Sequence, residues 1–224
     1  MGYSLVLDAV CSFVQMHEAR IENLLANIQS LKPQIVGEPI PTSHGPLAMT
    51  LFSTIFPPAS WDPREIEQTL AVVLPSELVS LWEKTSSLRL FEDRNFGQWG
   101  LVLWSPQEIL RQNPGERFDY RKEEFRAGDL LVGEFLGDLE RVLLRCEHDS
   151  HDFGSVMIVA ELDPRQDWFK PSRSILDFLE QFVAAEGEKF WETMTKECTK
   201  CRRGMPVTAR TCPHCGVPQD LASG

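Results

Sequence analysis

The sequence predicts an α+β fold in which helices flank an antiparallel sheet of about four to six strands. Helical signals come first along the chain, short β-rich segments lie in the middle, and a helical segment closes the main domain, an order typical of this class. The chain has 224 residues, enough for one sizeable domain and a small appendage. We expect a helix and connection over 1–61, an α+β domain over 62–194, and a cysteine-rich module over 195–218.

The first expected element is a helix over residues 4–31, which contain neither proline nor glycine. Ile21, Leu24 and Ile28 recur at helical spacing on one face. This stripe favours packing against the main domain. A dimer seam is the alternative, although fewer than the three or four heptads typical of a coiled coil are present.

Residues 32–63 are rich in proline, which removes backbone donors and blocks helix. We expect a long irregular connection here. One short apolar segment, residues 47–56, is expected to lie on the core.

Clear helix signals follow the connection. Asp62, Pro63 and Glu65 form an N-cap, a first-turn proline and a capping-box acid, which predicts a helix to about Val73. A second helix is expected over 74–87, and Ser105-Pro106 opens a third over 105–113. Two strands, 88–92 and 99–104, lie between them, with 93–98 as their turn.

The centre of the domain is the segment 129–147. Two β-rich runs flank Gly137-Asp138, which predicts a hairpin. Residues 154–162 read as a third strand, and residues 172–192 as a closing helix of some twenty residues.

Charge is unevenly distributed. The whole chain has a net charge of −11, but residues 1–195 hold 17 basic and 31 acidic residues, a net of −14. Such a body repels phosphate backbones and attracts basic partners. Nucleic acid is therefore not an expected partner of the main domain.

The sequence gives no sign of membrane insertion or export. No apolar run approaches the ~18 residues that cross a bilayer. The first residues lack the basic region and cleavage site of a secretory signal. We expect a cytoplasmic protein with no membrane partner.

The strongest motif is the cysteine pattern near the C-terminus. Cys198 and Cys201 form one Cys-x₂-Cys pair, and Cys212 and Cys215 form another ten residues later. This spacing is typical of a zinc ribbon, in which four thiolates close a tetrahedral site around a structural Zn²⁺. A disulfide pair or a redox Cys-x-x-Cys is the alternative.

The ribbon also carries basic residues, Arg202, Arg203 and Arg210, that could contact phosphate. We favour the interpretation that they offset the charge of the thiolates and dock the ribbon onto the acidic body. No aromatic residue lies between Cys198 and Gly216 to stack on bases. A nucleic-acid-associated or regulatory scaffold acting through the ribbon remains the alternative function.

A cluster from His148 to Asp152 has the residue types of a metal or acid–base site. It lies between two expected strands, where polar clusters ordinarily form solvated turns. No nucleophile or nucleotide-binding motif accompanies it. We therefore expect no catalytic residues and no enzymatic activity, with an enzyme centred on this turn as a further alternative.

The order of motifs resembles the SUKH superfamily. Residues 74–91 ("LPSELVSLWEKTSSLRLF") are similar to its opening helix and first strand, and "WGLVLWSPQEIL" to its next strand and short helix. "LLVGEFLGDLERVLLRC", "FGSVMIVA" and "SILDFLEQFV" resemble its paired strands, last strand and closing helix. The resemblance covers about residues 63–190; the N-terminal 60 residues and the ribbon lie outside it.

This resemblance implies a non-enzymatic binding domain. The superfamily includes bacterial immunity proteins that occlude polymorphic toxins, often nucleases or deaminases, and fungal cell-wall-assembly regulators. The resemblance thus implies an immunity protein for a cognate toxin, and the acidic body favours a basic one; a regulatory scaffold with other partners is the alternative. The sequence leaves open whether the protein is a monomer or a homodimer. Acidic and aromatic residues at two turns are the expected toxin contacts: Glu92, Asp93, Phe96 and Trp99 at one, Asp138 and Glu140 at the other.

Overall fold

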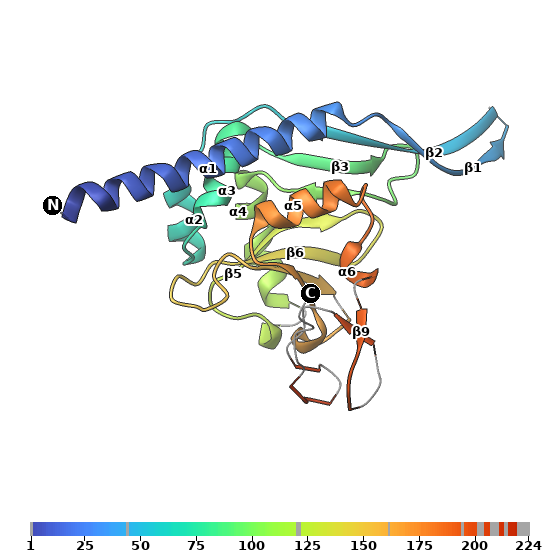
Figure 1. Ribbon diagram of the computed structural model, residues 1–224. Coiled ribbons are helices and arrows are strands. Elements are labelled where there is room, and N and C mark those ends of the chain that lie inside the picture. Colours follow the sequence, from blue (N-terminus) through green and yellow to red (C-terminus); the bar gives the residue numbers. More distant parts are fainter. Residues whose placement is uncertain are drawn as a thin grey trace.

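The fold is described from a computed structural model (Figure 1). It describes the backbone of residues 2–43, 45–119, 122–160, 162–193, 195–200, 204–206, 211–212 and 215–218. Side chains are described within these ranges except at 2–15, 42, 45–46, 114–119, 122, 193, 195–197 and 204–206.

Eight strands form one antiparallel sheet in which each strand pairs with its neighbours in sequence. The predicted fold class is confirmed, but the predicted count of four to six strands was wrong. The strands are β1 (Gln34–Thr42), β2 (Gly45–Ile55), β3 (Leu88–Asp93), β4 (Leu101–Leu103), β5 (Asp129–Phe135), β6 (Glu140–Arg145), β7 (Val156–Ala160) and β8 (Phe169–Ser172).

Two of the additional strands come from the proline-rich segment, which is a β-hairpin and not an irregular connection. β1 and β2 pair with each other, and the second half of β2 pairs with β3. Pro39 and Pro41 are tolerated because β1 is an edge strand, where a missing N–H breaks no interior ladder. A bulge between Val36 and Ile40 further relaxes the pairing.

The described part of the first helix, α1 (Gly2–Ser30), packs on the main domain as expected. Ile21, Leu24 and Ile28 are at most 2% exposed. Arg20 hydrogen-bonds Asp177 at 2.6 Å and Glu180 at 2.7 Å, and bonds to these carboxylates raise the pKa of Arg20 above its ordinary value. Over these residues the apolar stripe belongs to the core of its own chain.

Two of the three helices before the central strands begin where the sequence predicts, and the second of the three begins two residues later than expected. α2 (Pro63–Leu70) is capped by the Asp62 side chain, and α3 (Ser76–Lys84) buries Leu81 and Trp82. α4 (Pro106–Asp119) is opened by a capping box of Ser105 and Glu108 and runs beyond its expected end. α1, α3 and α5 (Ile175–Ala184) pack against one another (Figure 1).

The closing helix is shorter than predicted. α5 starts at the Ser174 cap and ends at Ala184, because Glu186 and Gly187 both have positive φ angles, 55° and 88°. A separate short helix, α6 (Phe190–Thr193), follows. The tail then contains a two-stranded sheet of β9 (Thr195–Glu197) and β10 (Gly204–Pro206).

Candidate partner-binding and metal sites

The structure brings the two turns with the expected partner contacts into direct contact. The β3–β4 turn and the β5–β6 turn lie at the same end of the sheet, which we call the turn end. Gly137 sits so close to the other turn that a Cβ would lie 2.3 Å from the carbonyl oxygen of Gln98, and its φ is +80°. Only glycine fits this crossing.

The acids of the first turn are not equally accessible. Asp93 is 1% exposed and accepts hydrogen bonds from the backbone N–H groups of Asn95 and Phe96, both at 3.1 Å. It therefore shapes the turn and presents no carboxylate at the surface. Glu92 is largely covered by Arg89, which donates to it at 2.5 Å, and by Arg94.

Two apolar residues of the turn end are exposed to solvent. Phe96 is 39% exposed and Leu139 is 60% exposed. Trp99 is partly buried and packs against the core. Leu139 was not among the predicted residues; its position directly after Gly137-Asp138 in a hairpin turn is the signal that could have identified it.

Lys189 joins the second turn to the connection between α5 and α6. Its ammonium lies 2.7 Å from Glu140, 2.9 Å from Asp138 and 3.6 Å from Glu192. Three carboxylates thus share one cation. Burial alone would lower the pKa of Lys189, but hydrogen bonds to Glu140 and Asp138 outweigh it and raise this pKa. Burial raises the pKa of Glu140, and Lys189 only partly opposes this.

The substitution Lys189→Gln is expected to destabilise the domain by about 1–3 kcal/mol at pH 7, because Glu140 would lose its cation while its carboxylate neighbours remain. The raised folded-state pKa of Glu140 means that the fold binds its proton more tightly than the unfolded chain does. Stability should therefore recover as the pH falls through this folded-state pKa. Urea unfolding at pH 7 and pH 5 measures the effect.

The matched control is Lys170→Gln, at an exposed lysine of β8. It should leave the unfolding midpoint unchanged at both pH values. Equal midpoints for Lys189→Gln and the unmodified chain at pH 7 would show that Lys189 does not hold this end of the sheet together.

The hollow beside this cluster is too small for a metabolite. It is lined by Trp99, Phe135, Phe182 and Lys189 among others, and has room for about one water molecule.

The cluster from His148 to Asp152 lies at the opposite end of the sheet, in the β6–β7 connection. His148 is exposed and contacts Asp149 at 3.1 Å, and Asp152 accepts hydrogen bonds from Ser150 and Arg145. Within the described ranges, these residues do not form a group with three metal-ligand atoms close together. These residues form a turn, and the Asp152 carboxylate helps to position the Arg145 side chain by accepting its hydrogen bond.

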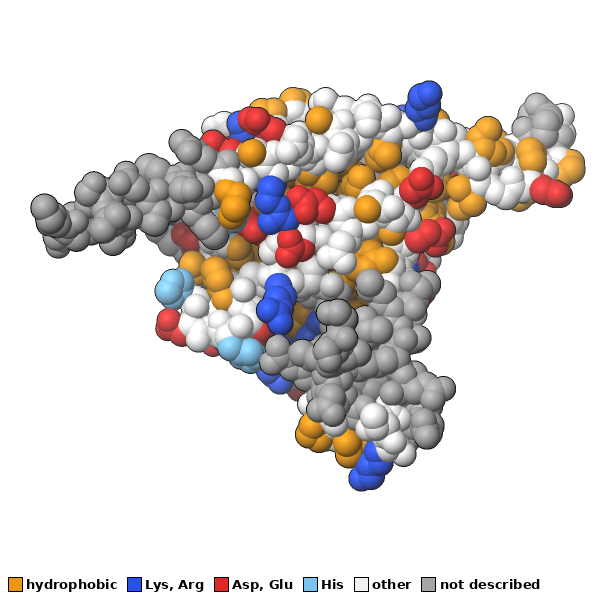
Figure 2. Space-filling view, viewed as in Figure 1, with side chains coloured by type: hydrophobic (Ala, Val, Ile, Leu, Met, Phe, Trp, Pro, Cys, Tyr) orange, Lys and Arg blue, Asp and Glu red, His pale blue; other side chains and the backbone are white. Residues whose placement is uncertain are grey.

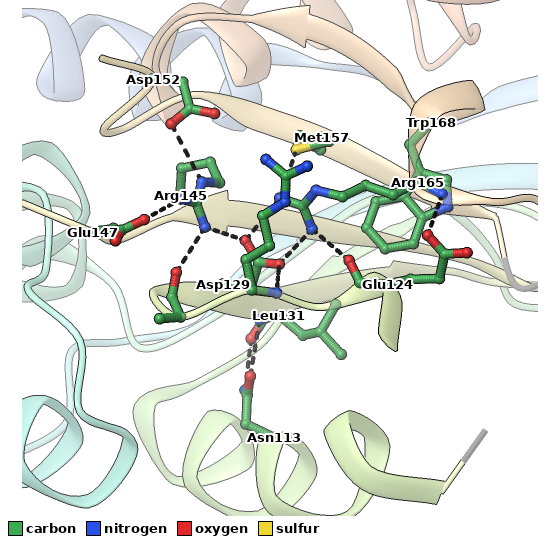
Figure 3. A network of polar contacts seen from close by, with 12 residues as sticks. Asn113, Glu124, Asp129, Leu131, Arg145, Glu147, Asp152, Met157, Arg165 and Trp168 are labelled. Carbon is green, nitrogen blue, oxygen red and sulfur yellow. Dashed lines mark hydrogen bonds and ion pairs between the residues drawn. The ribbon is translucent and has the colours of Figure 1, made fainter. Parts of the chain in front are cut away.

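A buried network around Asp129 fastens this end of the sheet (Figure 3). The Asp129 side chain is 0% exposed and accepts from Arg145 and from Arg165, the latter at 2.5 and 3.0 Å. Arg145 also donates a hydrogen bond to the Glu147 carboxylate at 2.6 Å, and Arg165 donates one to the backbone carbonyl of Glu124 at 3.0 Å. Burial opposes the charge of Arg145, but its bond to Asp129 prevails and raises the pKa of Arg145.

A second buried polar contact fills the bulge in β5. Asn113 of α4 donates to the carbonyl of Leu131 at 2.8 Å and accepts from its N–H at 2.9 Å. The register of β5 and β6 shifts at this point, so Leu131 depends on Asn113 for its backbone hydrogen bonds. Both buried contacts join separate elements of the fold and satisfy polar groups inside it.

Three of the four predicted metal ligands come together in the tail. The sulfurs of Cys198, Cys212 and Cys215 lie within 4.8 Å of one another, and the first two side chains are at most 1% exposed. The Sγ atoms of Cys198 and Cys215 are 3.6 Å apart, and no disulfide joins the described cysteines. Cys201 lies outside the described residues. The three sulfurs are close enough to bind one metal ion.

Backbone N–H groups make two described contacts around these sulfurs. The N–H of Lys200 points at the sulfur of Cys198 at 3.4 Å, an interaction that stabilises a thiolate. Gly216, with φ of 69°, turns the chain so that its N–H bonds the Cys212 carbonyl at 2.9 Å. The turn directs the two thiols of the second pair toward one point.

No protein-family model matches this chain, and no curated protein matches it either. The resemblance to the SUKH superfamily therefore rests on the sequence motifs alone. In the part of the chain that the structure describes, no helix has the length and hydrophobicity needed to cross a membrane.

Proposed function

We propose that this protein is an immunity protein, which binds a cognate polymorphic toxin and blocks it by occlusion. The observation that carries the proposal is the turn end, where Phe96 and Leu139 are exposed beside the acidic cluster of Asp138 and Glu140. Exposed apolar anchors surrounded by polar groups are typical of protein-binding surfaces.

The charge of the protein supports a basic partner. A toxin domain that acts on nucleic acid needs a positively charged cleft, and the acidic body would steer such a domain into contact. The small hollow at the turn end favours binding over catalysis. We therefore propose a non-enzymatic inhibitor of a nucleic-acid-targeting toxin.

We further propose that the metal in the tail is Zn²⁺, with Cys201 as the fourth ligand. Four thiolates close the coordination sphere and leave no position for a reacting water, so the ion is structural. In this proposal the ribbon folds the tail and takes no part in chemistry.

Phe96→Lys is expected to weaken toxin binding by about 100-fold, because it puts a charge where an apolar anchor is buried in the complex. The measurement is the equilibrium affinity for the toxin domain that co-purifies with the chain from its native host, produced separately in an inactive form. Protection of cells that express the active toxin gives the functional readout.

Val73→Lys is the matched control. Val73 is 40% exposed, close to the 39% of Phe96. The N–H of Val73 donates a hydrogen bond to the carbonyl of Cys146, which lies at the opposite end of the sheet. This variant should keep full affinity and protection. If both variants bind equally well, the turn end is not the toxin-binding surface; if no toxin co-purifies, the immunity function itself fails.

A further inference from the structure

The three described sulfurs of the tail differ in their access to solvent. Cys198 and Cys212 are 0% and 1% exposed, whereas Cys215 is partly exposed and is followed by the exposed Gly216. The described part of the tail lies at the lower edge of the molecule in Figure 2, where side chains of the hydrophobic class, which includes cysteine, reach the surface beside a basic one. Of these three sulfurs, Cys215 is therefore the one that a reagent in solution reaches.

The surroundings of these sulfurs favour the thiolate, which is the reactive form of cysteine. Residues 196–217 contain five lysine and arginine residues and one glutamate, in contrast to the acidic body. Lys200 is exposed, and its backbone N–H points at the sulfur of Cys198 at 3.4 Å. A bound metal ion would add positive charge and keep its thiol ligands deprotonated. An accessible thiolate in electropositive surroundings is a target for hydroperoxides.

The sulfur of Cys198 is placed to react with an oxidised Cys215. The two Sγ atoms are 3.6 Å apart, although the residues belong to different Cys-x₂-Cys pairs and are 17 positions apart in the sequence. A disulfide bond is about 2.05 Å long, so the sulfurs need to approach each other by only about 1.5 Å. A buried thiolate beside an accessible one can act as a resolving cysteine, which attacks its oxidised neighbour and is itself shielded from the oxidant.

We infer that Cys215 and Cys198 are a redox-sensitive pair, which a hydroperoxide converts to a disulfide with release of the metal ion. Cys215 is the residue that reacts with the oxidant, and Cys198 is the resolving residue. The inference rests on the metal site proposed for the tail and is independent of the immunity function.

The reaction has two steps. The thiolate of Cys215 attacks the terminal oxygen of the hydroperoxide, so that the O–O bond breaks, an S–O bond forms, and an alkoxide, or hydroxide from hydrogen peroxide, leaves. The thiolate of Cys198 then attacks the sulfur of Cys215, an S–S bond forms, and hydroxide leaves. Each sulfur loses one electron, and the peroxide bond accepts both.

The disulfide removes two thiolates from the metal at once. Because a metal ligand must be a deprotonated thiol, the disulfide sulfurs no longer hold the ion, and it dissociates. The tail then loses the binding free energy that folds it. The sheet lies outside this change, so the expected effect of the oxidant is confined to the tail.

The test is oxidation of the full zinc-loaded chain with hydrogen peroxide after removal of reductant. A chromogenic chelator measures the released zinc, and mass spectrometry of proteolytic peptides locates the disulfide. We expect about one zinc ion to be released for each disulfide formed, and the main product to join Cys198 to Cys215. Dithiothreitol and added zinc should restore the metal content, because disulfide formation is reversible.

Two variants separate the roles of the thiols. Cys198→Ser removes the resolving thiolate, so sulfenic acid should accumulate on Cys215, and its labelling by dimedone should rise by at least about tenfold. This labelling is read on the Cys215 peptide and does not depend on metal binding by the variant. Cys146→Ala is the matched control: Cys146 is 1% exposed and lies outside the tail, so zinc release should be unchanged.

A main product that joins any other two cysteines, zinc that stays bound after Cys215 is oxidised, or unchanged dimedone labelling in Cys198→Ser would overturn the inference. A chain that holds no zinc before oxidation would contradict the proposed metal. The disulfide formed in that chain would still decide whether Cys198 and Cys215 are the pair. Binding of the toxin at the turn end is measured separately, so the immunity function stands or falls on its own experiment.

Discussion

The substitution Asp129→Ala is expected to destabilise the main domain by about 3–5 kcal/mol, a large part of the total stability of a domain of this size. It removes the carboxylate that balances Arg145 and Arg165, whose side chains are only 3% and 10% exposed. Two guanidinium groups would remain buried side by side. Urea unfolding followed by tryptophan fluorescence gives the change in the free energy of unfolding.

Two further variants separate this cause from general damage. Asp149→Ala, at a side chain that is 99% exposed in a neighbouring turn, should change the stability by no more than about 0.5 kcal/mol. Asp129→Ala combined with Arg165→Met should be more stable than Asp129→Ala alone, since one uncompensated charge is removed. A loss below about 1 kcal/mol for Asp129→Ala would mean that water solvates the arginines.

The second large effect is expected in the tail. Cys212→Ser should abolish high-affinity metal binding, because it removes a buried thiolate from a cluster of sulfurs within 4.8 Å. Structural zinc sites of this kind contribute roughly 10–16 kcal/mol of binding free energy to the folding of their own module. The tail should therefore lose its protection from hydrogen exchange, while the sheet keeps its unfolding midpoint.

Metal content by elemental analysis provides the direct measurement. The unmodified chain should hold about one zinc ion per molecule, and Cys201→Ser should lose it as Cys212→Ser does. Cys146→Ala is the control, because this buried thiol lies outside the tail at the end of β6. Retention of zinc by Cys212→Ser would contradict the proposed ligand set.

The local rules of the sequence predicted many boundaries well. Asp62 and Ser105 open helices where their capping patterns indicate, because a cap is satisfied by the next few residues alone. Gly137-Asp138 marks the β5–β6 turn for the same reason. The end of α5 was missed, because Glu186 in the left-handed region has no strong local signal.

The proline-rich hairpin could not be predicted from local rules. Prolines argue against a strand in the interior of a sheet, and only the position of β1 at the edge makes them harmless. The strand assignment of β2 depends on its pairing with β3, some forty residues later. Such non-local pairing is decided by the packed fold.

The candidate sites show the same division. The spacing of Cys198, Cys212 and Cys215 was sufficient to predict that their sulfurs meet, since a short knuckle directs its thiols locally. The exposure of the surface residues could be learned only from the tertiary structure. Glu92 and Asp93 lie within four residues of Phe96 in the sequence, yet burial and ion pairs cover the two acids and leave the Phe96 ring partly exposed.

The sequence by itself therefore determined the α+β class, the helix starts, the central hairpin and the cysteine cluster, all of which depend on contacts between residues close in the chain. Only the tertiary structure decided that the proline-rich segment is a hairpin of the sheet, that Lys189 gathers three carboxylates, and that Asp129 is buried between two arginines. These features join elements that are far apart in the sequence, so their partners are set by the packed fold and no local pattern encodes them.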